Sequence, residues 1–287
     1  MAKTDFALFL NKTVFITGSQ KNAGKTTFLK YAVSSLRSEG ARPAYFSIGV
    51  DGETEDGISG RLKPVINAQA GDYIVTAESA LSASGAGFGI IDVLPEKSVF
   101  GRQVVAEVLR AGQVELIGAP GNRRIGEIIE AVRHETKANA ILIDGAVDRL
   151  TQVGASDGAG YVAVMLVEPS NLKRMCGLMR LGVQMDGIPV SSRVGDDVYE
   201  VEGALTPAKA ASVPKERSCV AIEDFTKVFL SPLEMQRLCG RYEVFFRRRR
   251  ELLYIVVNLS GMIASDFMRQ LADDAVAERL VMNPYAA

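Results

Sequence analysis

The chain has 287 residues, 47% of them hydrophobic, and its 33 basic and 34 acidic residues give a formal net charge of −1. This length and apolar content predict a globular protein with a large core, and they argue against intrinsic disorder. The balanced charge gives no indication of a nucleic-acid partner, and no stretch approaches the roughly eighteen uninterrupted apolar residues that a membrane span needs, so we expect no membrane partner either.

The beginning of the sequence has no cationic leader followed by a long apolar run, so we expect a cytoplasmic protein. The three cysteines, Cys176, Cys219 and Cys239, are far apart and form no Cys-x-x-Cys pair. We interpret them as thiols of a reducing compartment rather than as metal ligands.

The strongest functional pattern lies at residues 13–28. A short apolar run precedes Gly18-Ser-Gln-Lys-Asn-Ala-Gly-Lys-Thr-Thr27, and a helical pattern follows it. A turn between a strand and a helix aims backbone N–H groups and the positive end of the helix at one point, which suits a triphosphate. The usual phosphate loop has four residues between its first glycine and Gly-Lys-Ser/Thr. Here five residues separate Gly18 from Gly24, so Ser19 takes the place of the first glycine.

This pattern predicts a nucleotide-binding loop, with a purely structural strand-to-helix turn as the alternative. In the loop the Lys25 ammonium can reach the β- and γ-phosphates, where it would be catalytic, and the Thr26 hydroxyl can hold Mg²⁺. The predicted nucleotide-binding residues are Ser19, Gln20, Lys21, Asn22, Ala23, Gly24, Lys25, Thr26 and Thr27.

Residues 44–50 predict a second parallel strand, which would complete a right-handed βαβ unit with the loop and its helix. Asp51 follows this strand and would emerge at the same edge of the sheet as the loop. We expect Asp51 to bind Mg²⁺ or to orient the attacking water, with Glu53 and Asp56 as weaker candidates. The alternative is a solvated acidic turn that Asp51 caps.

Residues 60–118 predict a β-rich insertion within a single domain that spans residues 1–287. Short β-like runs at 72–76 and 89–94 flank a segment rich in serine, alanine and glycine. The run at 101–118 suits either a helix or a hairpin that turns at 110–113, and we favour the hairpin.

A clear amphipathic helical pattern follows residues 119–126, and Arg123 and Arg124 lie at its start. They could contact a phosphate, a nucleobase or a partner protein, and simple solvation is an equal alternative.

Residues 140–143 are apolar and end in Asp144. This pattern predicts a buried parallel strand that delivers a carboxylate to the edge of the sheet where the loop lies, either as an Mg²⁺ ligand or through a bound water.

Later in the chain, residues 163–167 and 252–257 predict two further strands, and residues 169–182 predict a helix. The arginine run at 247–250 is most simply a solvated loop or a protected edge, and otherwise a docking patch. Asn258 follows the last of these strands, so we expect it at the loop edge of the sheet. Its amide could read the N6 and N7 edge of adenine, or it could simply begin a turn.

Gly18 to Thr27, Asp51 and Asp144 resemble the corresponding motifs of dethiobiotin-synthetase-like P-loop ATPases, within the group that includes MinD and ParA. MinD-type members carry a lysine at the second loop position, where this chain has Gln20. The segments at 117–126, 143–146 and 223–229 are similar to a narrower family, the KamB-like ATPase subunit of the reactivase for adenosylcobalamin-dependent lysine and ornithine aminomutases.

The narrower resemblance implies a chaperone-like ATPase that works with a MutS-related second subunit to exchange damaged cobalamin from the aminomutase. We therefore expect an α/β fold with a mostly parallel sheet and helices on both faces. We expect an ATP hydrolase that uses Mg²⁺, held by Thr26, Asp51 and Asp144. The sequence does not decide between a monomer and a homodimer.

Two alternatives remain from the sequence: a ligase or kinase of the dethiobiotin-synthetase type, and a nucleotide-binding regulator without turnover. A ligase or kinase should have a second, enclosed pocket lined by cationic groups, for which Lys63 and Arg123 are the candidates.

Overall fold

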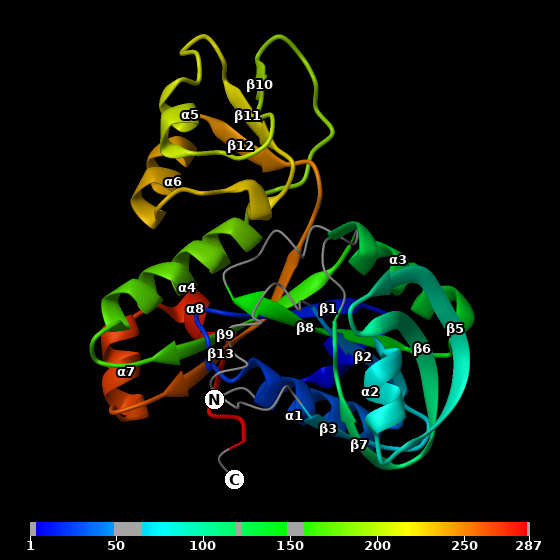
Figure 1. The fold of residues 1–287 in the computed structure, drawn as a ribbon. Coiled ribbons are helices and arrows are strands. Elements are labelled where there is room, and N and C mark those ends of the chain that lie inside the picture. The colour runs from blue at the N-terminus through cyan, green and yellow to red at the C-terminus, as the bar shows by residue number, and fades with distance from the viewer. Residues whose placement is uncertain (1–3, 49–64, 119–121, 148–157, 286–287) are drawn as a thin grey trace.

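A computed structural model describes residues 4–48, 65–118, 122–147 and 158–285. Its main feature is a nine-stranded sheet in the order β14-β13-β9-β1-β8-β2-β4-β6-β5 (Figure 1). From β14 to β4 every neighbouring pair is parallel, whereas β6 is antiparallel to both β4 and β5. The strands of this sheet are β1 (Thr13–Gly18), β2 (Pro43–Ser47), β4 (Tyr73–Ala77), β5 (Gly87–Ser98), β6 (Gly101–Arg110), β8 (Ala140–Val147), β9 (Gly160–Val167), β13 (Glu251–Leu259) and β14 (Leu280–Met282).

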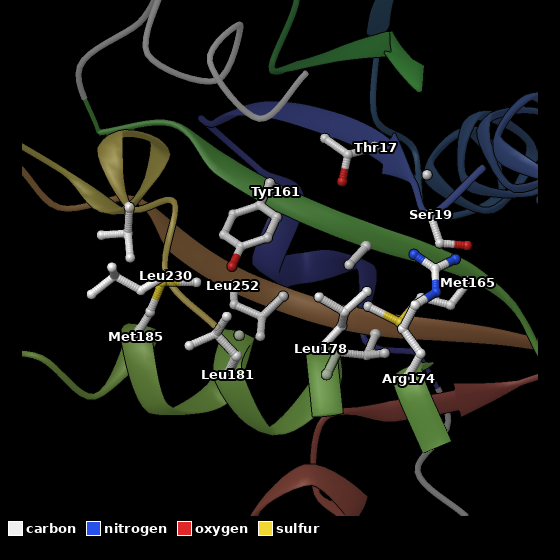
Figure 2. A pocket seen from close by; sticks show the side chains of 15 residues that line it. Thr17, Ser19, Tyr161, Met165, Arg174, Leu178, Leu181, Met185, Leu230 and Leu252 are labelled. Carbon is white, nitrogen blue, oxygen red and sulfur yellow. The ribbon is translucent and has the colours of Figure 1, made fainter. Parts of the chain in front are cut away.

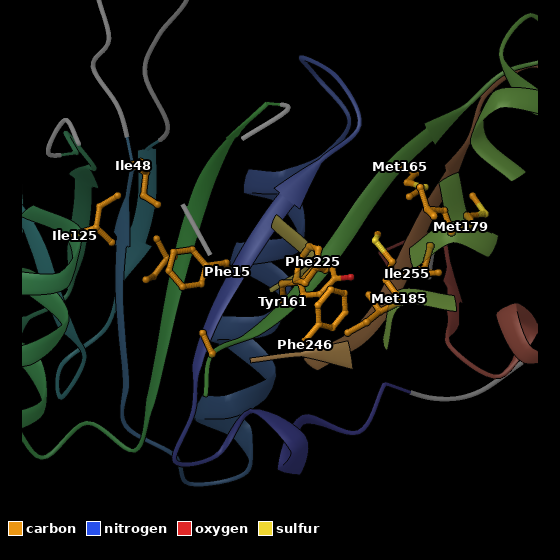
Figure 3. Packing of buried hydrophobic residues seen from close by; sticks show 14 of the residues in the cluster. Phe15, Ile48, Ile125, Tyr161, Met165, Met179, Met185, Phe225, Phe246 and Ile255 are labelled. Carbon is orange, nitrogen blue, oxygen red and sulfur yellow. The ribbon is translucent and has the colours of Figure 1, made fainter. Parts of the chain in front are cut away.

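Helices cover both faces of this sheet, which confirms the predicted fold class. Alternate side chains of β1 enter two different cores, because successive residues of a strand point to opposite faces. Phe15 packs in a cluster with Ile125 and Met179 (Figure 3). Val14 and Ile16 pack with residues of α1 on the other face. The helices are α1 (Lys25–Ser38) on one face, and α3 (Asn122–Glu135), α4 (Leu172–Asp186), α7 (Ala264–Leu271) and the short α8 (Asp274–Ala277) on the other.

The predicted βαβ unit forms, but its two strands are not neighbours. β8 lies between β1 and β2 and is parallel to both, and β9 borders β1 on its other side. The strand beside the loop is therefore the one that carries Asp144, while β2, which precedes Asp51, is one position further out.

The segment at 65–115 folds into five strands and α2 (Glu78–Ala83). The predicted hairpin at 101–118 is wrong, because the two halves of this run do not pair with each other. β6 pairs with β4 and β5, and β7 (Gly112–Glu115) pairs with β3 (Val65–Ala68) in a separate two-stranded sheet. The predicted β character of this stretch is confirmed, but local turn chemistry does not determine which strands meet.

Between α4 and β13 the chain forms a smaller parallel sheet, in the order β10-β11-β12, which lies at the top of Figure 1 beside α5 (Pro207–Ala211) and α6 (Pro232–Cys239). Its strands are β10 (Val198–Glu200), β11 (Cys219–Ile222) and β12 (Glu243–Phe246). We call this part of the chain the small lobe. A capping box at the start of α6, formed by Ser231 and Glu234, explains why this helix begins at Pro232.

The arginine run that joins β12 to β13 is not a simple solvated loop. The Arg250 side chain is fully buried and its Nε lies 3.3 Å from Asp224 Oδ2. Arg247 donates to both carboxylate oxygens of Glu200 and lies over the ring of Phe245. The run therefore fixes the small lobe to the large sheet. None of the helices in the described ranges has the length and apolar character needed to cross a membrane.

Candidate nucleotide site

The loop between β1 and α1 has the backbone conformation of a tight turn into a helix. Asn22 and Gly24 have positive φ values of 62° and 99°, and Gly24 is the residue that precedes α1. A side chain on residue 24 would also collide with its surroundings, since a Cβ there would lie 2.5 Å from Asn258 Nδ2. Glycine is the residue that adopts this conformation at no steric cost.

Lys25 folds back over the beginning of the loop. A Cβ at position 18 would lie 2.9 Å from both Cγ and Cδ of Lys25 and 3.1 Å from its Nζ, so Gly18 leaves the space that this side chain occupies. The ammonium group thus lies inside the turn, beside the N-terminus of α1. This is the position that neutralisation of a triphosphate requires.

Thr26 and Asp144 meet at the first turn of α1. The Thr26 hydroxyl donates to Asp144 Oδ2 at 2.7 Å. In the sheet, Asp144 lies opposite Ile16 of β1 and Ser47 of β2, so the carboxylate reaches the loop edge from the strand directly beside the loop. These two predicted site residues, 118 positions apart in the sequence, are therefore in direct contact.

The carboxylate of Asp144 is in an electrostatically costly position. Its other oxygen, Oδ1, is buried without a hydrogen-bond partner among the described residues. Burial raises the pKa of this carboxyl above its ordinary value, and the hydrogen bond from Thr26 and the positive charge of Lys25 oppose that shift. A buried acid with an unused oxygen is a group that a cation would stabilise.

These residues fit Mg²⁺. The ion prefers oxygen ligands and keeps several waters, so one hydroxyl and one carboxylate are an ordinary protein contribution to such a site. Thr26 would bind the ion directly and Asp144 would bind it directly or through water. No cluster of three or more histidine, cysteine or acidic side chains that could hold a metal occurs in the described part of the chain.

The remaining loop residues lie as a continuous turn. Ser19 is held against β9, because its N–H donates to the Val164 carbonyl and its Oγ accepts from the Leu166 N–H. The Ala23 N–H donates to the Gln20 carbonyl. Lys21, Asn22 and Thr27 are exposed.

Asn258 lies against the loop, as its place at the end of β13 predicted. Its Nδ2 donates to the Ala23 carbonyl at 2.7 Å and to the Tyr285 hydroxyl at 3.1 Å. Both N–H groups of the amide are thereby used by the protein. A base contact through this side chain would have only the oxygen Oδ1 available, so the predicted two-point contact with adenine needs a rearrangement of these bonds.

Several candidate residues take no part in the described site. Asp51, Glu53, Asp56 and Lys63 lie outside the described residues. The Arg123 side chain is 88% exposed and pairs with Glu127 one helical turn later, at 3.0 Å. Arg124 pairs with Glu96 of β5. Arg123 is therefore in keeping with the solvated alternative, whereas the Arg124 side chain is only 18% exposed and packs toward β5.

Two residues that belong to no sequence motif, Arg174 and Tyr161, line a cavity beside the loop together with Ser19 (Figure 2). Arg174 is in register with Leu178, Leu181 and Met185 on one face of α4, and this stripe could have been read from the sequence. That it faces a cavity rather than a filled core depends on the packing of the small lobe.

No protein-family model matches this chain, and no curated protein matches it. Among solved structures, the chain is similar to that of pNOB8 ParA bound to nonspecific DNA, with a TM-score of 0.40 and 10% sequence identity over 96% of this chain and 80% of that one.

Proposed function

We propose that this chain is a Mg²⁺-dependent ATP hydrolase whose nucleotide cycle changes the conformation of a partner protein. The observation that carries the proposal is the contact between Thr26 and Asp144 at the N-terminus of α1, with Asp144 Oδ1 left without a partner. A glycine-bearing turn, a lysine folded into it and an acid from the neighbouring strand are the parts that hold a metal-bound triphosphate.

In this proposal each residue has one role. The backbone N–H groups at the start of α1 and the Lys25 ammonium bind the phosphate oxygens and stabilise the charge that grows on them during transfer. Thr26 and Asp144 hold Mg²⁺, which neutralises charge on the β- and γ-phosphates when it is bound. Asp51, predicted from the sequence to orient the attacking water, is the candidate for positioning the nucleophile.

We further propose, from the sequence resemblance alone, that the partner is an adenosylcobalamin-dependent aminomutase together with a MutS-related second subunit. The reaction would then be the exchange of damaged cobalamin, driven by ATP. The segments at 117–126, 143–146 and 223–229 support this narrower proposal, and the last of them includes Asp224 and Phe225, which connect the small lobe to the large sheet.

A ligase or kinase of the dethiobiotin-synthetase type is the second candidate, because a cavity lies beside the first residues of the loop. Its wall is mainly apolar, however, and Arg123 does not line it. The cation at the cavity is Arg174.

Phosphate release by the purified chain, measured with Mg²⁺ and ATP in the presence and absence of the MutS-related protein and the aminomutase, separates these functions. We expect slow hydrolysis alone and a faster rate with the partners. Phosphate transfer to a small molecule without free phosphate would support the kinase instead. Tight ATP binding with no turnover under any of these conditions would instead support the third function, a nucleotide-binding regulator that does not hydrolyse ATP.

A further inference from the structure

A cavity of about 270 Å³ lies between the large sheet and α4, next to the start of the phosphate loop (Figure 2). Most of its wall is apolar, with contributions from α4, β9, β13 and the segment that precedes α6. Met165, Leu178, Leu181, Met185, Leu230 and Leu252 are among the side chains that form it. Its size is near the lower end of the range for small-molecule sites.

The chain has room for a larger side chain at one position of the cavity wall. Gly182 lines the cavity, and a Cβ at this position would meet only Leu252 Cδ2, at an ordinary contact distance of 3.7 Å. A larger residue at the same point of α4 would also be a better helix former than glycine. Protein interiors contain few voids larger than a water molecule. Gly182 thus leaves open a space that a larger side chain could occupy, and a small molecule could fill this space instead.

One polar group is buried in this apolar wall. Tyr161 is 4% exposed, and its ring is stacked on Phe225 with the ring centroids 4.7 Å apart. Its hydroxyl turns toward α4 and Leu252 at the wall of the cavity (Figure 2). A phenolic hydroxyl can both donate and accept a hydrogen bond, so it can bond a polar atom of a molecule bound there.

A cationic group lies at the end of the cavity that borders the loop. Arg174 reaches toward Ser19 (Figure 2). It lies one to three turns before the apolar residues on the same face of α4. It makes no ion pair with any residue in the described ranges. The Ser19 Oγ accepts a bond from the Leu166 N–H and still has its own proton to donate. A guanidinium and a hydroxyl together suit a carboxylate.

We propose that this cavity binds a small aliphatic carboxylic acid. The carboxylate lies between Arg174 and Ser19, the hydrocarbon chain lies along the apolar face of α4, and Tyr161 bonds a polar atom at the far end of the ligand. This site borders the triphosphate site at Ser19. It can be tested without nucleotide, and its failure leaves the proposed ATPase function untouched, because that proposal depends on Thr26 and Asp144.

The test is titration calorimetry on the full chain without nucleotide, with octanoate and octylammonium as probes of equal chain length and opposite charge. We expect one octanoate to bind per chain and octylammonium not to bind. Arg174→Gln should weaken octanoate binding at least about 10-fold, the factor for roughly 1.4 kcal/mol. Because Arg174 is exposed on its helix, this variant should keep the fold.

Two further variants locate the ligand. Gly182→Leu fills the cavity and should abolish octanoate binding, while Gly177→Ala on the same helix should leave it unchanged, because Gly177 faces Pro232 instead. Wild-type protein should prefer 8-hydroxyoctanoate over octanoate, and Tyr161→Phe should remove that preference. The proposal is overturned if wild-type protein does not bind octanoate, if it binds both charges equally, or if a folded Gly182→Leu variant binds octanoate as before.

Discussion

The hydroxyl of Thr26 donates to Asp144 Oδ2 at 2.7 Å, which joins the first turn of α1 to the strand beside the loop. Because β8 is parallel to β1 and ends at the same edge, this contact positions a carboxylate where the metal of a bound nucleotide would lie.

Lys25→Ala should weaken ATP binding at least about 10-fold, since a hydrogen bond to a charged group contributes roughly 1.5–3 kcal/mol. Titration calorimetry with ATP and Mg²⁺ measures the effect. Lys30→Ala is the matched control, because Lys30 is an exposed lysine of the same helix. Equal affinities of wild type and Lys25→Ala would exclude the loop as the phosphate site.

Asp144→Asn should stabilise the nucleotide-free protein. Because burial raises the folded-state pKa of this carboxyl, the folded state binds more protons than the unfolded state, and stability falls as pH rises from near the ordinary value of 3.8 through the folded pKa. Asparagine removes the cost of the buried charge. We expect a higher melting temperature at neutral pH, by about 2–4 °C for roughly 1 kcal/mol, and a flatter dependence on pH.

The same variant should lower the rate of Mg²⁺-dependent hydrolysis by roughly 10–100-fold, the usual loss when a group that supports a metal is changed. Asp266→Asn, which removes an exposed charge, serves as control. A normal rate combined with a higher melting temperature would show that the buried acid has no part in the reaction.

Asn258→Ala tests whether the asparagine reads the base or supports the loop. Its two N–H groups bond Ala23 and Tyr285, so we expect the variant to weaken ATP and GTP binding by a similar factor. Competition binding gives the ratio of the two affinities. A selective loss of ATP over GTP would instead establish the base-reading role predicted from the sequence.

Arg250→Ala should destabilise the protein by about 3–5 kcal/mol, because it leaves the Asp224 carboxylate buried without its cation. Arg249→Ala, at the exposed neighbouring position of the same run, should change the free energy of unfolding by no more than about 0.5 kcal/mol. Urea unfolding compares the two. Similar small effects in both variants would mean that the run is held only by its surface contacts.

The elements with strong local patterns were predictable from the sequence. The loop with its flanking strand and helix, the helix that contains Arg123 and Arg124, and the strand that carries Asp144 all follow from apolar periodicity and, in the loop, from Gly24 at a position of positive φ. The predicted end of this strand is Asp144, but the strand continues to Val147. Their meeting at one edge follows from the parallel direction of the strands, which a βαβ pattern already implies.

The remaining features depend on contacts that no local pattern records. The insertion of β8 between β1 and β2, and the pairing of β7 with β3, are choices among strands of similar composition. The burial of Arg250 depends on Asp224, which lies 26 positions earlier in the small lobe. The cavity at Tyr161 is lined in part by Val228 and Leu230 of that lobe, so it could not be inferred from Tyr161 alone.

The central position of β1 has a consequence for synthesis of the chain. Both strands that flank β1, which are β8 and β9, begin more than about 120 residues after it along the chain. Non-local pairing of this kind makes folding slow, and the exposed edges of β1 must stay unpaired in the meantime. The nascent chain would acquire affinity for a triphosphate only after residue 167 has emerged, so retention on immobilised nucleotide would report how far a translating chain has assembled its sheet.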